Sequence, residues 1–169
     1  MDLRKTILTE HSKSNCDRIV KWVGNSQQRF DELFYLFLND EYRVVQRAAW
    51  AVSYVAMKYP GLMKNNFGKL IRNLRKPELP VAVKRNVVRL LKGIPIPKQF
   101  HGELMSSCFE YLVSVNETVA VKVFSMTILA NLSKIYPEIK SELKLILEEH
   151  WDQQTAGFKS RAKKTLKSL

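Results

Sequence analysis

Cysteine, histidine and catalytic motifs are all sparse in this 169-residue sequence. Cys16 and Cys108 are too few for a disulfide framework and lack the close spacing of metal ligands. No Gly-rich phosphate loop and no HExxH motif occurs. The sequence therefore predicts no metal and no cofactor, and we expect both cysteines to be reduced residues of the core.

Long hydrophobic runs are also missing. The longest run, residues 33–38, is far shorter than the roughly 20 apolar residues that a transmembrane helix needs. The first residues, MDLRK, are charged and no apolar segment follows them. These features predict a cytoplasmic protein with no signal peptide and no contact with membranes.

Acidic residues are nearly absent from the middle of the chain. The formal net charge is +12, and residues 64–98 contain ten basic residues against the single acid Glu78. Residues 101–152, in contrast, contain eight acids and four bases. A one-sided block of positive charge predicts a surface that attracts polyanions or acidic proteins.

A period of 38 residues runs through the sequence. Val45, Val83 and Val121 begin the related segments VQRAAWAV, VKRNVVRL and VKVFSMTI, and a weaker copy, KSRAKKTL, begins at Lys159. In the first three copies mainly apolar residues recur at i, i+4, i+7 and i+11, as on one face of an α-helix. A repeat of this length predicts stacked pairs of helices.

Apolar spacing and proline positions set the expected helix boundaries. We expect ten helices and no strands, over residues 2–11, 14–23, 26–39, 42–59, 62–75, 80–93, 100–115, 118–136, 138–151 and 156–168. The pattern predicts one domain over 1–169, with capping helices in 1–24 and repeats at 26–59, 62–93, 100–136 and 138–168. Asp40 and Asn116 are predicted N-caps, and Ser14 with Asp17 suggests a capping box.

The repeats resemble the HEAT repeat, in which an acid in the turn precedes Val-Arg and then small and branched residues. The resemblance covers residues 26–169, although Gln46 replaces the usual basic residue of the first copy. It implies an all-α, right-handed α-α superhelix whose second helices line a concave face. A chance period in another kind of helical bundle is the alternative reading.

One column of side chains is the candidate partner-binding site. Arg85, Arg89 and Lys92 fall at i, i+4 and i+7, opposite the apolar stripe of their helix. The matching positions one repeat earlier include Arg47 and Tyr54, with Lys58 one turn beyond. The alternative is that these bases only keep the protein soluble. Trp50 is expected to pack in the core or between repeats.

A second resemblance concerns residues 15–24 (NCDRIVKWVG) and 43–52 (RVVQRAAWAV), which look like parts of the HEAT-like DNA glycosylases that excise alkylated bases. It implies a catalytic carboxylate at Asp17 and a phosphate contact at Arg47. Cys16 stands where that family usually has an aromatic residue. Because acids are almost absent from the outward columns of the second helices, the sequence favours a non-catalytic scaffold. Its basic face would bind an acidic protein or a nucleic-acid backbone, and the sequence does not fix the oligomeric state.

Overall fold

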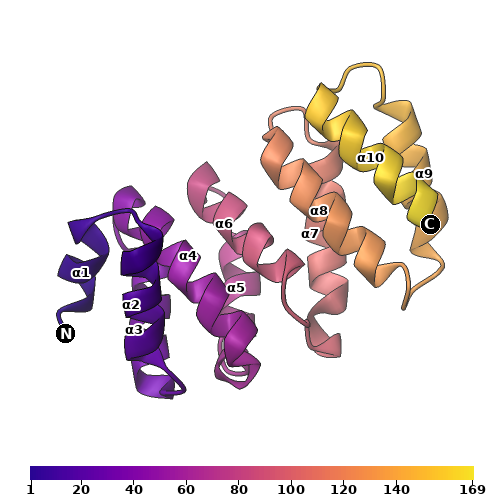
Figure 1. Ribbon diagram of the computed structural model, residues 1–169. Helices are drawn as coiled ribbons and strands as arrows, with labels where there is room; N and C mark the ends of the chain where they lie inside the picture. The colour runs from indigo at the N-terminus through magenta and orange to yellow at the C-terminus, as the bar shows by residue number, and fades with distance from the viewer. The chain divides into compact units, whose positions relative to one another are not determined.

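The computed structural model describes residues 1–169 and contains ten α-helices, two short 3₁₀ helices and no strand (Figure 1). The predicted all-helical class and the count of ten helices are confirmed. The chain forms two compact units, residues 1–96 and 97–169. The expected single-domain organisation stays a prediction.

The N-terminal unit has three successive helix pairs. Its helices are α1 (Leu3–Thr9), α2 (Lys13–Val23), α3 (Gln27–Asn39), α4 (Tyr42–Lys58), α5 (Phe67–Leu74) and α6 (Val81–Lys92), with a 3₁₀ helix at Pro60–Met63 before α5. The central helix is α4, which packs against α1, α2, α3 and α6. The second helix of the middle pair therefore connects all three pairs of this unit.

Small residues let α4 pack on two sides. The predicted stripe is buried, and so is a second stripe beside it; the two stripes are Val45, Ala49, Val52 and Ala56, and Val44, Ala48, Ala51 and Val55. Four of these eight residues are alanines, which allow neighbouring helices to approach closely. The sequence RAAWAV thus explains why α4 lies at the centre of the unit.

Three phenylalanines of α3 form the largest aromatic group of the N-terminal core. Phe30, Phe34 and Phe37 are each at most 1 % exposed. The ring centroids of Phe30 and Phe34 lie 5.7 Å apart, and those of Phe34 and Phe37 lie 5.9 Å apart. Full burial of one such side chain stabilises the fold by about 1.5–3 kcal/mol.

The C-terminal unit has two helix pairs, α7 (His101–Val113) with α8 (Val119–Leu132) and α9 (Ile139–Glu149) with α10 (Ala156–Ser168), preceded by a 3₁₀ helix at Lys98–Phe100. Its central helix is α8, which packs against α7 and α10. In α10 the buried residues are Phe158, Ala162 and Thr165. These residues match Val44, Ala48 and Ala51 of α4 in the 38-residue register, whereas the column of Val45 is not buried in α10, which explains why the fourth copy is weak.

The predicted helix caps are wrong. The helix α2 begins after Ser12, whose hydroxyl accepts from the Asn15 backbone N–H, so Ser14 and Asp17 form no capping box. The residues that precede α4 and α8 are Glu41 and Thr118, rather than Asp40 and Asn116. Asp40 instead accepts two hydrogen bonds from the guanidinium of Arg4, at 2.9 and 3.0 Å.

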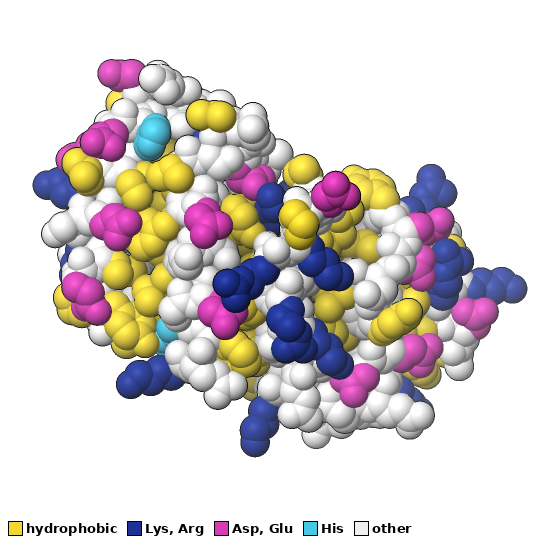
Figure 2. Space-filling model, turned by 180° about the vertical axis from the view of Figure 1, so that it is seen from behind, with side chains coloured by type: hydrophobic (Ala, Val, Ile, Leu, Met, Phe, Trp, Pro, Cys, Tyr) yellow, Lys and Arg dark blue, Asp and Glu magenta, His cyan; other side chains and the backbone are white.

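Charge is distributed unevenly over the surface. Figure 2 shows several Lys and Arg side chains close together on one face. Over the part where the C-terminal unit is drawn (left), acidic side chains alternate with hydrophobic ones. None of the helices combines the length and the apolar character that crossing a membrane requires.

Candidate binding groove between α4 and α6

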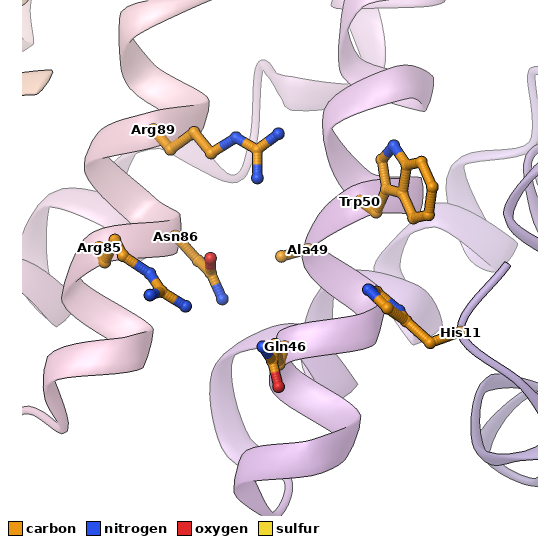
Figure 3. Close-up of a pocket in the computed structure, with 7 residues that line it drawn as sticks. All are labelled: His11, Gln46, Ala49, Trp50, Arg85, Asn86 and Arg89. Carbon is orange, nitrogen blue, oxygen red and sulfur yellow. The ribbon is translucent and has the colours of Figure 1, made fainter. Parts of the chain in front are cut away.

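A polar pocket lies between α4 and α6, both of which belong to the N-terminal unit. It has a volume of about 260 Å³. Figure 3 shows its three walls: Arg85, Asn86 and Arg89 come from α6, Gln46, Ala49 and Trp50 from α4, and His11 from the segment after α1. No acidic residue lines it. We call it the polar pocket.

The two arginines give this pocket its charge. Arg85 is half-buried and Arg89 is exposed, and both side chains extend from α6 toward α4 (Figure 3). The sequence of α6, VAVKRNVVRLLK, contains no acid. Like charges at this i, i+4 spacing repel each other by about 0.2–0.5 kcal/mol. An anion bound between the two arginines would remove this repulsion, which destabilises the free protein.

Asn86 adds a buried hydrogen-bond donor. Its side chain is 5 % exposed, and its Nδ2 has no hydrogen-bond partner. Ala49, which faces it from α4, is too small to fill the space between the helices (Figure 3). A buried N–H group without a partner loses about 1–3 kcal/mol relative to its hydrated state. The pocket therefore offers an unused donor beside two positive charges.

A second and more apolar pocket adjoins the first and shares Trp50 and Arg89 with it. Its volume is about 230 Å³. The other lining residues are Ser53, Tyr54, Met57, Leu90, Lys92, Gly93 and Ile94. We call it the apolar pocket, and we call the two together the α4–α6 groove. The groove pairs a site for charge with a site for a hydrophobic side chain.

Aromatic contacts hold the α4 wall of the groove. The ring centroid of Trp50 lies 5.4 Å from that of His11 and 6.5 Å from that of Tyr54. The ammonium of Lys13 lies 4.7 Å from the centroid of the Tyr54 ring, a cation–π contact from α2. Trp50 is only half-buried, so its indole is partly available on the groove surface.

The predicted site residues divide into two groups. Arg85 and Arg89 meet in the polar pocket, and Tyr54, Arg89 and Lys92 meet in the apolar pocket. Lys58 lies outside both, exposed at the end of α4 with its ammonium 5.4 Å from the Tyr59 ring centroid. Partner binding by these residues stays a prediction.

Arg47 has a structural contact that the sequence reading did not anticipate. Its Nη1 donates to the carbonyl oxygens of Leu8 at 2.9 Å and Ile7 at 3.3 Å. These carbonyls lie in the last turn of α1, where the helix supplies no N–H group to donate to them. Arg47 therefore closes the end of α1 rather than extending the column of Arg85.

Asn15 completes the same closure. Its Nδ2 donates to the carbonyl oxygens of Thr6 at 2.8 Å and Glu10 at 3.0 Å. Asn15 is 4 % exposed, so these bonds are shielded from water. Together with Arg47 it fixes the segment that carries His11 to the edge of the polar pocket.

Asp17, the weak catalytic candidate, lies on the exposed face of α2. Its carboxylate pairs with Lys13, four residues earlier, and 56 % of its side chain is exposed. The hydrogen bond from Lys13 to Asp17 raises the pKa of that lysine. Asp17 lines neither pocket of the groove.

A family model described as a HEAT repeat domain matches residues 3–169. This chain belongs to the HEAT-repeat family. No curated protein and no solved structure matches the sequence. The weaker resemblance to the HEAT-like DNA glycosylases is therefore unsupported, and with it the implied roles of Asp17 and Arg47.

As a HEAT-repeat protein, the chain is a helical-repeat scaffold of a kind that typically mediates protein interactions. Three polar residues that line the polar pocket, His11, Gln46 and Asn86, were not predicted from the sequence. For Asn86 a signal was present, because the equivalent positions in the first and fourth copies are Ala48 and Ala162, both fully buried. Asn86 is the one polar residue of this column, which elsewhere contains Ala48, Phe124 and Ala162, and it marks a place where the core is open to a polar group.

Proposed function

We propose that this HEAT-repeat protein is a non-catalytic binding module that holds an acidic protein segment in the α4–α6 groove. The observation that carries the proposal is the contact between two unlike pockets that share Trp50 and Arg89. An extended peptide places successive side chains a few ångströms apart, so an acidic and an apolar side chain could enter the two pockets together.

The groove suits a protein better than a nucleic-acid backbone. Backbone binding needs a track of cations that neutralises successive phosphates. Arg47, which the column needs in the first repeat, is hydrogen-bonded to α1, and Val123 replaces an arginine in the third. Met57, Leu90 and Ile94 in the apolar pocket have no charge or hydrogen-bond donor to bind a phosphate. They would instead bury an aliphatic side chain.

The lining also favours binding over chemistry. Neither pocket of the groove contains Asp or Glu, so the groove lacks a carboxylate that could serve as a general base. The groove instead contains two arginines, a tryptophan and a tyrosine, which are the residue types enriched in binding hot spots.

The test is fluorescence anisotropy with two labelled probes, a peptide that alternates Glu and Leu and a short DNA duplex. We expect the peptide to bind, and the double variant Arg85→Glu/Arg89→Glu to weaken it by roughly tenfold or more, because both charges at the groove are reversed. Replacement of every Leu of the peptide by Ser should weaken binding as well.

The matched control is Lys64→Glu/Lys69→Glu, which makes the same change in net charge on two exposed lysines of the same unit outside the groove. This variant should bind the peptide nearly as the parent does. Equal losses in both double variants would show that only the overall field matters. Tighter binding of the duplex than of the peptide, with a steep salt dependence, would favour the nucleic-acid partner instead.

A further inference from the structure

The unpartnered Nδ2 of Asn86 identifies the polar pocket as a site for an acceptor group. Buried amide N–H groups in folded proteins nearly always have a partner, and one that lacks it calls for an explanation. This amide is nine-tenths buried, lines the pocket and lies between Arg85 and Arg89 on the same helix. Its surroundings therefore point to an anion as the missing acceptor.

The charge and the donors of the pocket exceed what a carboxylate needs. A carboxylate carries one negative charge on two oxygens, whereas two guanidinium groups, the Asn86 amide and the Gln46 amide converge here. A phosphomonoester carries about −1.5 to −2 charges at pH 7 and presents three acceptor oxygens. Its charge and its number of acceptors match the two arginines and the neutral donors.

The shape of the groove distinguishes a phosphorylated side chain from the phosphodiester of a nucleic acid. A phosphodiester within a nucleic acid carries a single charge and is flanked by sugars on both sides, so it cannot enter a pocket end-on. A phosphorylated side chain can, because its phosphoryl group is terminal. The apolar pocket next to it then receives a neighbouring side chain of the same segment.

We propose that the polar pocket binds a phosphorylated serine or threonine side chain, held by Arg85, Arg89 and the Nδ2 of Asn86. This inference rests on the proposed function, since it names the anchoring group of the acidic segment in the α4–α6 groove. Phosphorylation of the partner would then control its attachment to this scaffold.

The experiment compares three labelled peptides that differ at one position, which is serine, glutamate or phosphoserine, with a leucine two residues further on. Binding is measured by fluorescence anisotropy at constant ionic strength. Because phosphoserine carries about −1.5 to −2 charges on three acceptor oxygens, whereas glutamate carries one charge on two, we expect the phosphoserine peptide to bind at least about tenfold more tightly than the glutamate peptide. Arg85→Gln and Arg89→Gln should each remove most of that difference.

Asn86→Ala supplies a readout that a purely structural residue would not give. It removes a buried donor without a partner, so the free protein should resist urea as well as or better than the parent while the preference for phosphoserine falls. The matched control is Asn73→Ala on α5, because Asn73 is 4 % exposed and also has an unpartnered Nδ2, but lines neither pocket. Asn73→Ala should leave the preference unchanged.

A spectroscopic measurement locates the anion. In ¹H–¹⁵N spectra, titration with inorganic phosphate should shift the side-chain amide signals of Asn86 and leave those of Asn73 in place. Failure of these signals to move would overturn the inference.

The peptide series separates this inference from the proposed function. Equal binding of the glutamate and phosphoserine peptides would overturn the phosphate inference and leave the acidic-segment function standing. Absence of binding for all three peptides would overturn both. Equal binding of a 5′-phosphorylated oligonucleotide and the phosphoserine peptide would overturn the assignment to a protein side chain.

Discussion

Replacement of Arg47 by methionine should loosen the first helix of the protein without altering the groove cations. Methionine keeps the length and apolar volume of the arginine stem but cannot donate to the carbonyls of Ile7 and Leu8. The last turn of α1 then has only Asn15 to satisfy its carbonyls. We expect α1 to detach from α4 more often in this variant.

The magnitude follows from the geometry of the two hydrogen bonds. The bond to Leu8, at 2.9 Å, is of normal length, and a bond with a charged donor contributes about 1.5–3 kcal/mol. The bond to Ile7, at 3.3 Å, is longer than the usual range and adds little. Because Arg47 is only half-buried, we take the lower part of that range and expect a loss of about 1.5–2 kcal/mol.

Hydrogen exchange of the α1 amides, together with urea denaturation followed by circular dichroism, measures this loss. The matched control is Arg43→Met, one turn earlier on α4, where the arginine is exposed and makes no ion pair. Exchange in α1 should quicken by about tenfold or more in Arg47→Met and stay unchanged in the control. Identical exchange and identical urea midpoints in the two variants would refute the structural role of Arg47.

Three further predictions concern the core and the titrating groups. Phe34→Ala should lower the free energy of unfolding by about 3–5 kcal/mol in urea denaturation, because it empties a fully buried position. The Arg4 ion pair holds the pKa of Asp40 below its ordinary value of 3.8, so its stabilisation is complete above that pH and disappears as the pH falls through the lowered pKa. Asp40→Asn should therefore flatten the acid limb of the stability–pH curve, and an unchanged limb would contradict the pairing. Full burial raises the pKa of Cys108 to about 12, so at pH 8 this thiol should react with Ellman's reagent only after urea is added.

The repeat could be predicted because burial follows a period that a sequence displays directly. Val45, Val83 and Val121 recur 38 residues apart, and all three are buried. Boundaries set by local backbone geometry were harder to predict. The predicted helix over 62–75 begins inside the 3₁₀ helix at Pro60–Met63, whereas α5 begins only at Phe67. The apolar spacing is the same in both segments, so it does not reveal where one helix ends and the other begins.

The caps and the site show a second limit, which is contact across long stretches of chain. Asp40 looks like an N-cap locally, but Arg4, 36 residues earlier, binds its carboxylate. Arg47 and Arg85 occupy the same repeat position, yet only Arg47 has helix-end carbonyls within reach, about 40 residues away. Identical positions in a repeat therefore have different partners, and the sequence pattern alone does not distinguish them.

The polar pocket belongs to no single repeat, because its walls come from three successive helix pairs: the segment after α1, then α4, then α6. Insertion of an extra helix pair on either side of α4 would separate His11 or Arg85 from the other lining residues. The binding site therefore depends on which helix pairs are neighbours, and no single helix pair carries it. A transplant that aims to carry the binding property into another solenoid must move residues 1–96 as one block.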